Sequence, residues 1–142
     1  MAELEAGSTA GRPHARPLSP HLQIYRWTMT MAMSVFHRVT GSALYFGTLL
    51  LAWWLIAAAS GPKAYANVEW FMGTIIGRLI LFGYTWALIH HMLGGVRHLI
   101  WDTIHGFGPH EREWLARATL GGSIVLTIVL WVIGYLMMGG PR

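Results

Sequence analysis

Five residues near the end of one long apolar stretch have the types and spacing of a ligand-binding helix face. His91, Gly95, His98, Asp102 and His105 follow one another at steps of four, three, four and three residues, which places them on one side of a helix. Ionisable residues inside apolar, membrane-length segments are costly to place in lipid and are usually functional. The sequence therefore predicts a polar ridge with a flat notch at the glycine, one turn from His91.

This ridge suits a haem. Haem iron takes a neutral imidazole as an axial ligand, and glycines at 94 and 95 leave room for the flat macrocycle beside His91. Asp102 lies eleven residues further on, about 16 Å along the helix, so the propionates would lie nearer the aqueous edge than the iron. No second histidine lies deep in the other two apolar stretches. A haem with two protein ligands would therefore need one from another chain.

Two other interpretations of these residues stay open. His90 points about 100° away from His91 and shares a face with Gly94, Arg97 and Trp101, so it competes as the ligand. Alternatively, the histidines only hydrogen-bond neighbouring helices, and the glycines mark a close helix crossing.

A second group of polar residues lies at the start of the first apolar stretch. Ser34 and Arg38 are four residues apart, with His37 beside them, at the expected depth of Asp102. A quinone head group has two carbonyl oxygens that need hydrogen-bond donors, and a hydroxyl and a guanidinium are such donors. Asp102 could orient Arg38 or relay protons. An Arg38–Asp102 ion pair, or Arg38 reaching lipid phosphates, explains the same residues without a ligand.

The composition says what kind of protein must position these groups. The 142 residues are 54% hydrophobic and only 11% charged, about half the charge of a soluble domain, which excludes a disordered chain. The absence of cysteine excludes disulfides and iron–sulfur ligation within this chain. The net charge is +4, but the arginines lie near the ends of apolar stretches, so we expect no nucleic-acid partner.

Three apolar stretches are long enough to cross a bilayer, which needs about 20 residues. We therefore predict an all-α membrane protein with a tail over residues 1–28 and a three-helix transmembrane domain over residues 29–142. The predicted spans cover about residues 30–60, 70–101 and 115–139. Short connections over residues 61–69 and 102–114 contain glycine and proline, which interrupt helices.

The arginines and lysines predict the orientation. Most lie in the tail or beside the second connection, and few lie on the other side: Arg12, Arg16, Arg26, Arg38, Arg97, Arg112 and Arg117 against Lys63 and Arg142. The positive-inside rule then places the N-terminus in the cytoplasm. The tail has no apolar segment typical of a signal peptide and does not look like a transit peptide. We expect a multi-pass protein of a bacterial inner membrane.

Two gapped motifs make the chain resemble a known family. The first begins with RPLSPHLQIYR at Arg16 and continues through Met29, Ser34, His37, Arg38 and Thr40. The second comprises His91, the run Gly95-Val96-Arg97-His98-Leu99, and Trp101-Asp102. With three spans in the right order, the chain resembles the cytochrome b556 subunit of succinate dehydrogenase, a membrane anchor of respiratory complex II.

The resemblance implies roles for single residues. His91 matches the axial ligand of haem b, and the second ligand then comes from a second hydrophobic anchor subunit that completes the helical bundle. Ser34 and Arg38 match residues of the ubiquinone site, and Asp102 matches a carboxylate close to it. His37 and His98 match positions near the haem propionates.

The resemblance also implies partners. A flavoprotein subunit with FAD would oxidise succinate, and an iron–sulfur subunit would pass electrons to ubiquinone. This chain would do no succinate chemistry itself. It would act as the anchoring, electron-transferring subunit of an enzyme shared by the respiratory chain and the tricarboxylic acid cycle.

Three alternatives differ from this interpretation. A haem-free structural anchor would keep the spans and make His91 a packing residue. An anchor of a quinol:fumarate reductase would serve the reverse reaction. A small transporter or channel subunit would use Arg78, His91 and Asp102 as an ion path, but it leaves Ser34 and Arg38 unexplained. Taken alone, Arg78 is expected to snorkel to the opposite membrane surface.

Overall fold

The computed structural model describes residues 25–139, and these residues form four helices and no strand. The helices are α1 (Met29–Ser60), α2 (Pro62–Gly73), α3 (Ile75–Asp102) and α4 (Pro109–Met137). Three of them, α1, α3 and α4, are long and apolar enough to cross a membrane. The predicted all-α membrane fold with three spans is confirmed, while most of the predicted tail, residues 1–24, lies outside the described residues.

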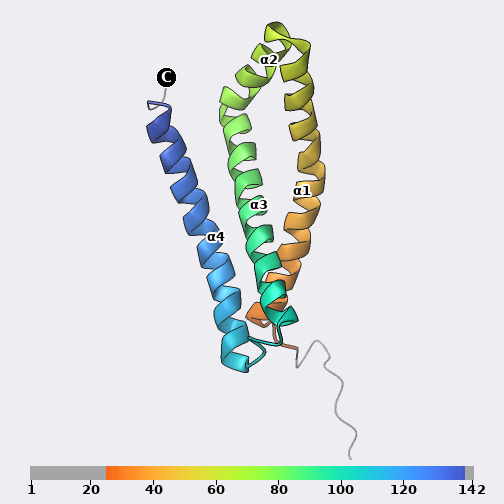
Figure 1. Ribbon diagram of the computed structural model, residues 1–142, viewed down its shortest axis with the longest axis vertical. Helices are drawn as coiled ribbons and strands as arrows, with labels where there is room; N and C mark the ends of the chain where they lie inside the picture. Colours follow the sequence, from red (N-terminus) through yellow and green to blue (C-terminus); the bar gives the residue numbers. More distant parts are fainter. Residues whose placement is uncertain (1–24, 140–142) are drawn as a thin grey trace, which may run out of the picture.

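The long helices run up, down and up, with α3 packed against both of the others (Figure 1). Helix α1 leads away from the end where the described chain begins, α2 turns the chain at the far end, and α3 returns. The start of α1, the end of α3 and the start of α4 therefore meet at one end of the bundle. We call it the histidine end, because His37 and His98 lie there.

The connection between the first two spans is a helix, which the sequence analysis did not predict. Gly61 ends α1 with a φ of 109°, a conformation that favours glycine. Pro62 then occupies the first position of α2, where its missing N–H is not needed. The Thr74 side chain caps α3 by accepting a hydrogen bond from a backbone amide of the first turn. The span expected from about Trp70 therefore begins instead at Ile75.

The packing of the bundle is that of a protein surrounded by lipid. Large apolar side chains face outward along all three long helices, whereas most buried positions carry small or hydroxyl-bearing residues: Thr40, Gly47, Ala57, Ala87, Ala116, Thr119, Ser123 and Thr127. Small residues let helices approach closely where lipid removes the hydrophobic driving force. The buried hydroxyls donate to carbonyls one turn back, as Thr127 does to Ser123 at 2.7 Å.

The junction of α2 and α3 depends on a glycine. A Cβ atom at Gly77 would lie 2.7 Å from Cα of Met72 and 2.9 Å from the carbonyl carbon of Phe71, and backbone atoms cannot yield without opening the junction. Gly77→Ala should therefore destabilise the protein by about 1–3 kcal/mol. Gly83→Ala is the control, because nothing lies within 4 Å of its added Cβ. The thermal midpoints of both variants in detergent test this, and equal midpoints would contradict a tight junction.

Candidate functional site

The His91 side chain lies half-buried on α3 and faces α1. Its Nδ1 lies 3.2 Å from the backbone carbonyl oxygen of His37 and 3.5 Å from Oγ1 of Thr40. Its ring stacks on the ring of His37, with centroids 4.0 Å apart and planes inclined by 7°. Nε2 of His91 has no hydrogen-bond partner among residues 25–139, and this atom is not buried. One ring nitrogen is therefore engaged and the other is open.

The two glycines beside His91 have different neighbours. A Cβ at Gly94 would overlap the imidazole of His37, whose Cε1 would lie only 2.9 Å away. Gly94 therefore makes room for a histidine of α1. The expectation that Gly94 forms part of an open notch is wrong. At Gly95 no such contact arises within 4 Å, so of these two glycines only Gly95 leaves an open, flat surface on α3.

The predicted ridge is helical from His91 to Asp102 and no further. His98 and Asp102 are exposed, and the ring of His98 lies 5.6 Å from that of His37. His105 was predicted as the fifth member of the ridge, and this is wrong because α3 ends at Asp102. Its ring instead lies in the connection to α4, with Nδ1 2.6 Å from the carbonyl oxygen of Thr103.

His90 points about 100° away from His91 and packs between α4 and Phe36 of α1. The side chain is 1% exposed, and its Nδ1 lies 3.2 Å from Oγ of Ser123. Trp86 and Phe36 cover the ring, with centroids 5.2 and 6.2 Å away. A flat macrocycle has no access to this histidine. Both histidines therefore make helix–helix contacts, His90 with α4 and His91 with α1, but only His91 keeps a nitrogen that is not buried.

Arg97 is a feature of the site that the sequence analysis missed. It was counted among the charges flanking a connection, but it is only 4% exposed. Its guanidinium carbon lies 5.1 Å from the ring centroid of Trp101, within range of a cation–π interaction, and its Nε has no partner among the described residues. The signal was present, since Arg97 shares a helix face with His90 and Gly94. The burial of Arg97 places a cation inside the bundle at the histidine end.

The three residues expected at a quinone site lie at the histidine end. Ser34 and Arg38 are exposed in the first turns of α1, and Asp102 is exposed at the last position of α3. Within residues 25–139 the ion pair that forms is Arg117–Glu113, at 3.1 Å. Arg38 and Asp102 are thus not paired with each other. Their charges remain available to a ligand, a partner chain or lipid.

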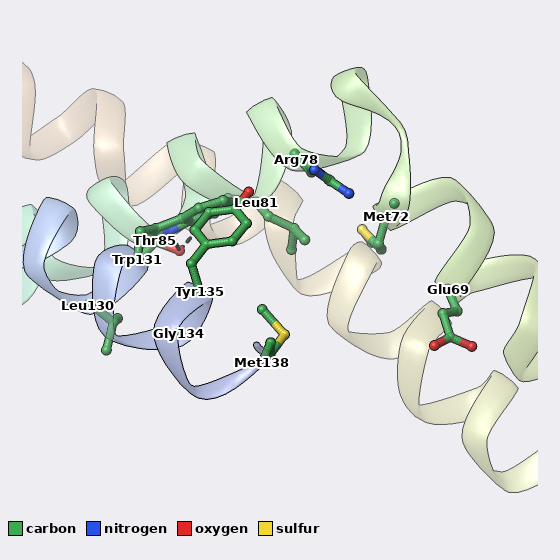
Figure 2. A pocket seen from close by; sticks show the side chains of 11 residues that line it. Glu69, Met72, Arg78, Leu81, Thr85, Leu130, Trp131, Gly134, Tyr135 and Met138 are labelled. Carbon is green, nitrogen blue, oxygen red and sulfur yellow. Dashed lines mark hydrogen bonds between the residues drawn. The ribbon is translucent and has the colours of Figure 1, made fainter. Parts of the chain in front are cut away.

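A large cavity lies at the other end of the bundle. It has a volume of about 620 Å³ and lies between α2, α3 and α4, where Glu69 and Arg78 bring charge to a mostly apolar wall (Figure 2). Trp131 donates a hydrogen bond from Nε1 to Oγ1 of Thr85 at 3.3 Å on this wall. None of the residues predicted to bind haem or quinone lines it.

Comparison with known proteins decides the family. Residues 12–130 match the family described as the succinate dehydrogenase/fumarate reductase transmembrane subunit. The chain belongs to this family. The matched range contains the polar residues of α1 and the whole ridge of α3, so the resemblance inferred from the two motifs is confirmed.

Individual relatives agree with the family. The succinate dehydrogenase cytochrome b556 subunit of Paracoccus denitrificans is 39% identical over 133 residues, which cover 94% of this chain and 97% of the relative. The subunit of the same name from Rickettsia felis is 38% identical over 117 residues, covering 82% and 91%. The mitochondrial succinate dehydrogenase cytochrome b560 subunit of Sus scrofa is 36% identical over 119 residues, covering 81% and 66%.

The contact of His37 with α3 gives a prediction about the packing of the site. Gly94→Ala should push the His37 ring off His91 and loosen the α1–α3 contact, at a cost of about 1–3 kcal/mol. Gly95→Ala is the matched control, because its Cβ meets nothing within 4 Å. Thermal unfolding of the two variants in detergent should separate them. A Gly94→Ala variant as stable as Gly95→Ala would mean that the two rings do not pack as described.

Proposed function

We propose that this chain is a cytochrome b membrane anchor of succinate dehydrogenase, which holds haem b with a second anchor subunit and contributes to the site of ubiquinone reduction. The observation that carries the proposal is that Nε2 of His91 is not buried and has no hydrogen-bond partner among residues 25–139, one turn before the bare surface of Gly95. The names of the relatives, cytochrome b556 and b560 subunits, support a haem at this surface.

The residues around His91 fit such a group. A haem ligand needs an imidazole nitrogen that is both free and accessible. Nε2 of His91 is free and not buried, whereas Nε2 of the 1% exposed His90 is free but buried. His37 stacks on His91, and His98 lies near His37 toward the histidine end; both would face the propionates. Haem b, when bound, supplies a one-electron redox centre. The open side of His91 supports a second ligand from the companion anchor subunit.

The exposed groups at the histidine end would bind and protonate ubiquinone. Its reduction to ubiquinol takes two electrons and two protons. Arg38 would polarise one carbonyl oxygen and stabilise the negative charge that develops there, as an oxyanion hole does. Ser34 would donate a hydrogen bond to the head group, and Asp102 would orient Arg38 or relay a proton from water.

The arginine distribution supports the orientation and partners of the complex. With the positive-inside rule, the histidine end faces the cytoplasm of a bacterium. A flavoprotein subunit carrying FAD and an iron–sulfur subunit would dock there, so that electrons from succinate arrive beside Ser34 and Arg38. The description of the family covers fumarate reductases as well. The relatives are succinate dehydrogenase subunits, which favours succinate oxidation.

The haem ligand is tested by a spectrum. The dithionite-reduced minus oxidised spectrum of the detergent-purified complex should show a b-type band that His91→Ala removes. His105→Ala is the control, because this exposed histidine lies beyond the end of α3. A band that survives in His91→Ala would reject the ligand. No band in the wild-type complex, expressed with haem supplied, would leave a haem-free anchor.

The quinone site is tested by separating two activities. Arg38→Ala should lower ubiquinone reduction by roughly ten- to a hundredfold, since a lost hydrogen bond from a charged group costs about 1.5–3 kcal/mol. Succinate oxidation with a soluble artificial acceptor should be unchanged. Arg78→Ala, at the cavity of the opposite end, is the control. Loss of both activities in Arg38→Ala would indicate failed assembly, and loss of quinone reduction in Arg78→Ala alone would move the quinone to that cavity.

A further inference from the structure

Two acceptor atoms of α1 meet the engaged nitrogen of His91. One is the carbonyl oxygen of His37, at 3.2 Å, and the other is Oγ1 of Thr40, at 3.5 Å. Thr40 is only 2% exposed, so its hydroxyl faces the α1–α3 contact and not lipid. The same hydroxyl lies 2.8 Å from the carbonyl oxygen of Phe36 and 3.0 Å from that of His37.

The protons can be assigned from these contacts. A threonine hydroxyl has one proton, and the carbonyls of α1 one turn back are acceptors that take it. Toward His91 the Thr40 oxygen can then only accept, as can the His37 carbonyl. An unprotonated Nδ1 would face two lone-pair-bearing oxygens with no hydrogen between them. Nδ1 therefore carries the proton of the neutral ring, and Nε2 carries the lone pair.

We infer that Thr40, together with the His37 carbonyl, is a positioning residue that fixes the tautomer and ring orientation of His91, so that Nε2 is presented to the haem iron. This inference rests on the proposed function. Thr40 need not touch the haem to act in this way. Hydrogen-bond acceptors behind a metal-binding histidine set its tautomer and raise its basicity, and their loss typically weakens metal binding by about 10–100-fold.

The neighbouring glycine completes the same cradle. A Cβ at Gly41 would lie 3.0 Å from Cε1 of His91, closer than ordinary packing allows. The edge of the His91 ring thus packs against the backbone of Gly41, while its Nδ1 contacts the hydroxyl of Thr40. Thr40 is the last residue of the motif of α1 and Gly41 follows it, yet the haem and quinone assignments above use neither.

The experiment compares three variants of the purified complex. Thr40→Val removes the acceptor with little change in shape, and Thr40→Ser keeps it. Thr48→Val is the matched control, because Thr48 is exposed on the same helix and its hydroxyl donates to the carbonyl of Tyr45 at 2.6 Å. The readouts are the rate of haem loss to an excess of a haem-scavenging apoprotein and the midpoint potential of the b-type band in a redox titration.

Thr40→Val should lose haem about tenfold faster, the lower end of the usual effect of such acceptors. Its midpoint potential should rise, because a less basic imidazole stabilises the ferric state less. Thr40→Ser and Thr48→Val should match the wild-type complex in both readouts. A merely structural role for Thr40 would not raise the potential of haem that stays bound.

Three results would overturn the inference. In the first, Thr40→Val matches the wild type in both readouts while His91→Ala still removes the band, so the inference fails and the proposed function stands. In the second, Thr48→Val shifts as much as Thr40→Val. In the third, the band survives in His91→Ala, so His91 is not the ligand and the inference falls together with that part of the proposed function. If Thr40→Val does not assemble, Gly41→Ala takes its place, with faster haem loss expected and wild-type retention contradicting the cradle.

Discussion

A membrane interior offers no water to polar groups, so a polar side chain buried in α3 is stabilised by a partner on a neighbouring helix. Two adjacent histidines of α3 each find one such partner, on different helices. His90 contacts Ser123 of α4, and His91 contacts the carbonyl of His37 in α1. Because consecutive helical residues point about 100° apart, the two histidines contact two different neighbours of α3. These contacts connect α3 with both of the other long helices.

The same constraint explains why only one of the two histidines is suited to a ligand. His90 is enclosed by Trp86, Phe36 and α4, and its Nε2 is buried without a partner among the described residues, so a planar cofactor cannot reach it. His91 has Nδ1 against the His37 carbonyl of α1, whereas its Nε2 is not buried and has no partner among residues 25–139. An accessible ring nitrogen without a partner fits the proposed haem site, in which a second subunit would supply the other ligand.

The sequence predicted what depends on local periodicity. The three spans and the helical ridge from His91 to Asp102 follow from apolar length and spacing, and the structure contains them. It did not predict α2, because Gly61-Pro62 was taken as a break, whereas proline at the first position starts a helix. His105 was placed on the ridge because spacing alone does not show where a helix ends.

Contacts between helices could not be predicted from the sequence, for a different reason. The stacking of His37 on His91, and its use of the space at Gly94, depend on the register of α1 against α3, which no periodicity encodes. Burial of Arg97 depends on the same register. The sequence motifs thus identified which residues belong to the site. Only the packed bundle shows which of these residues are enclosed and which are accessible.

The position of the His91 contacts along the chain has a consequence for biogenesis. Every atom that orients this ring lies between His37 and Gly94, within the hairpin of α1, α2 and α3. A chain leaving the ribosome contains that whole hairpin before α4 has been synthesised. The contacts that orient the ring are therefore all present once α1 and α3 have packed together. Helix α4 packs against α3 afterwards, where Ser123 contacts His90.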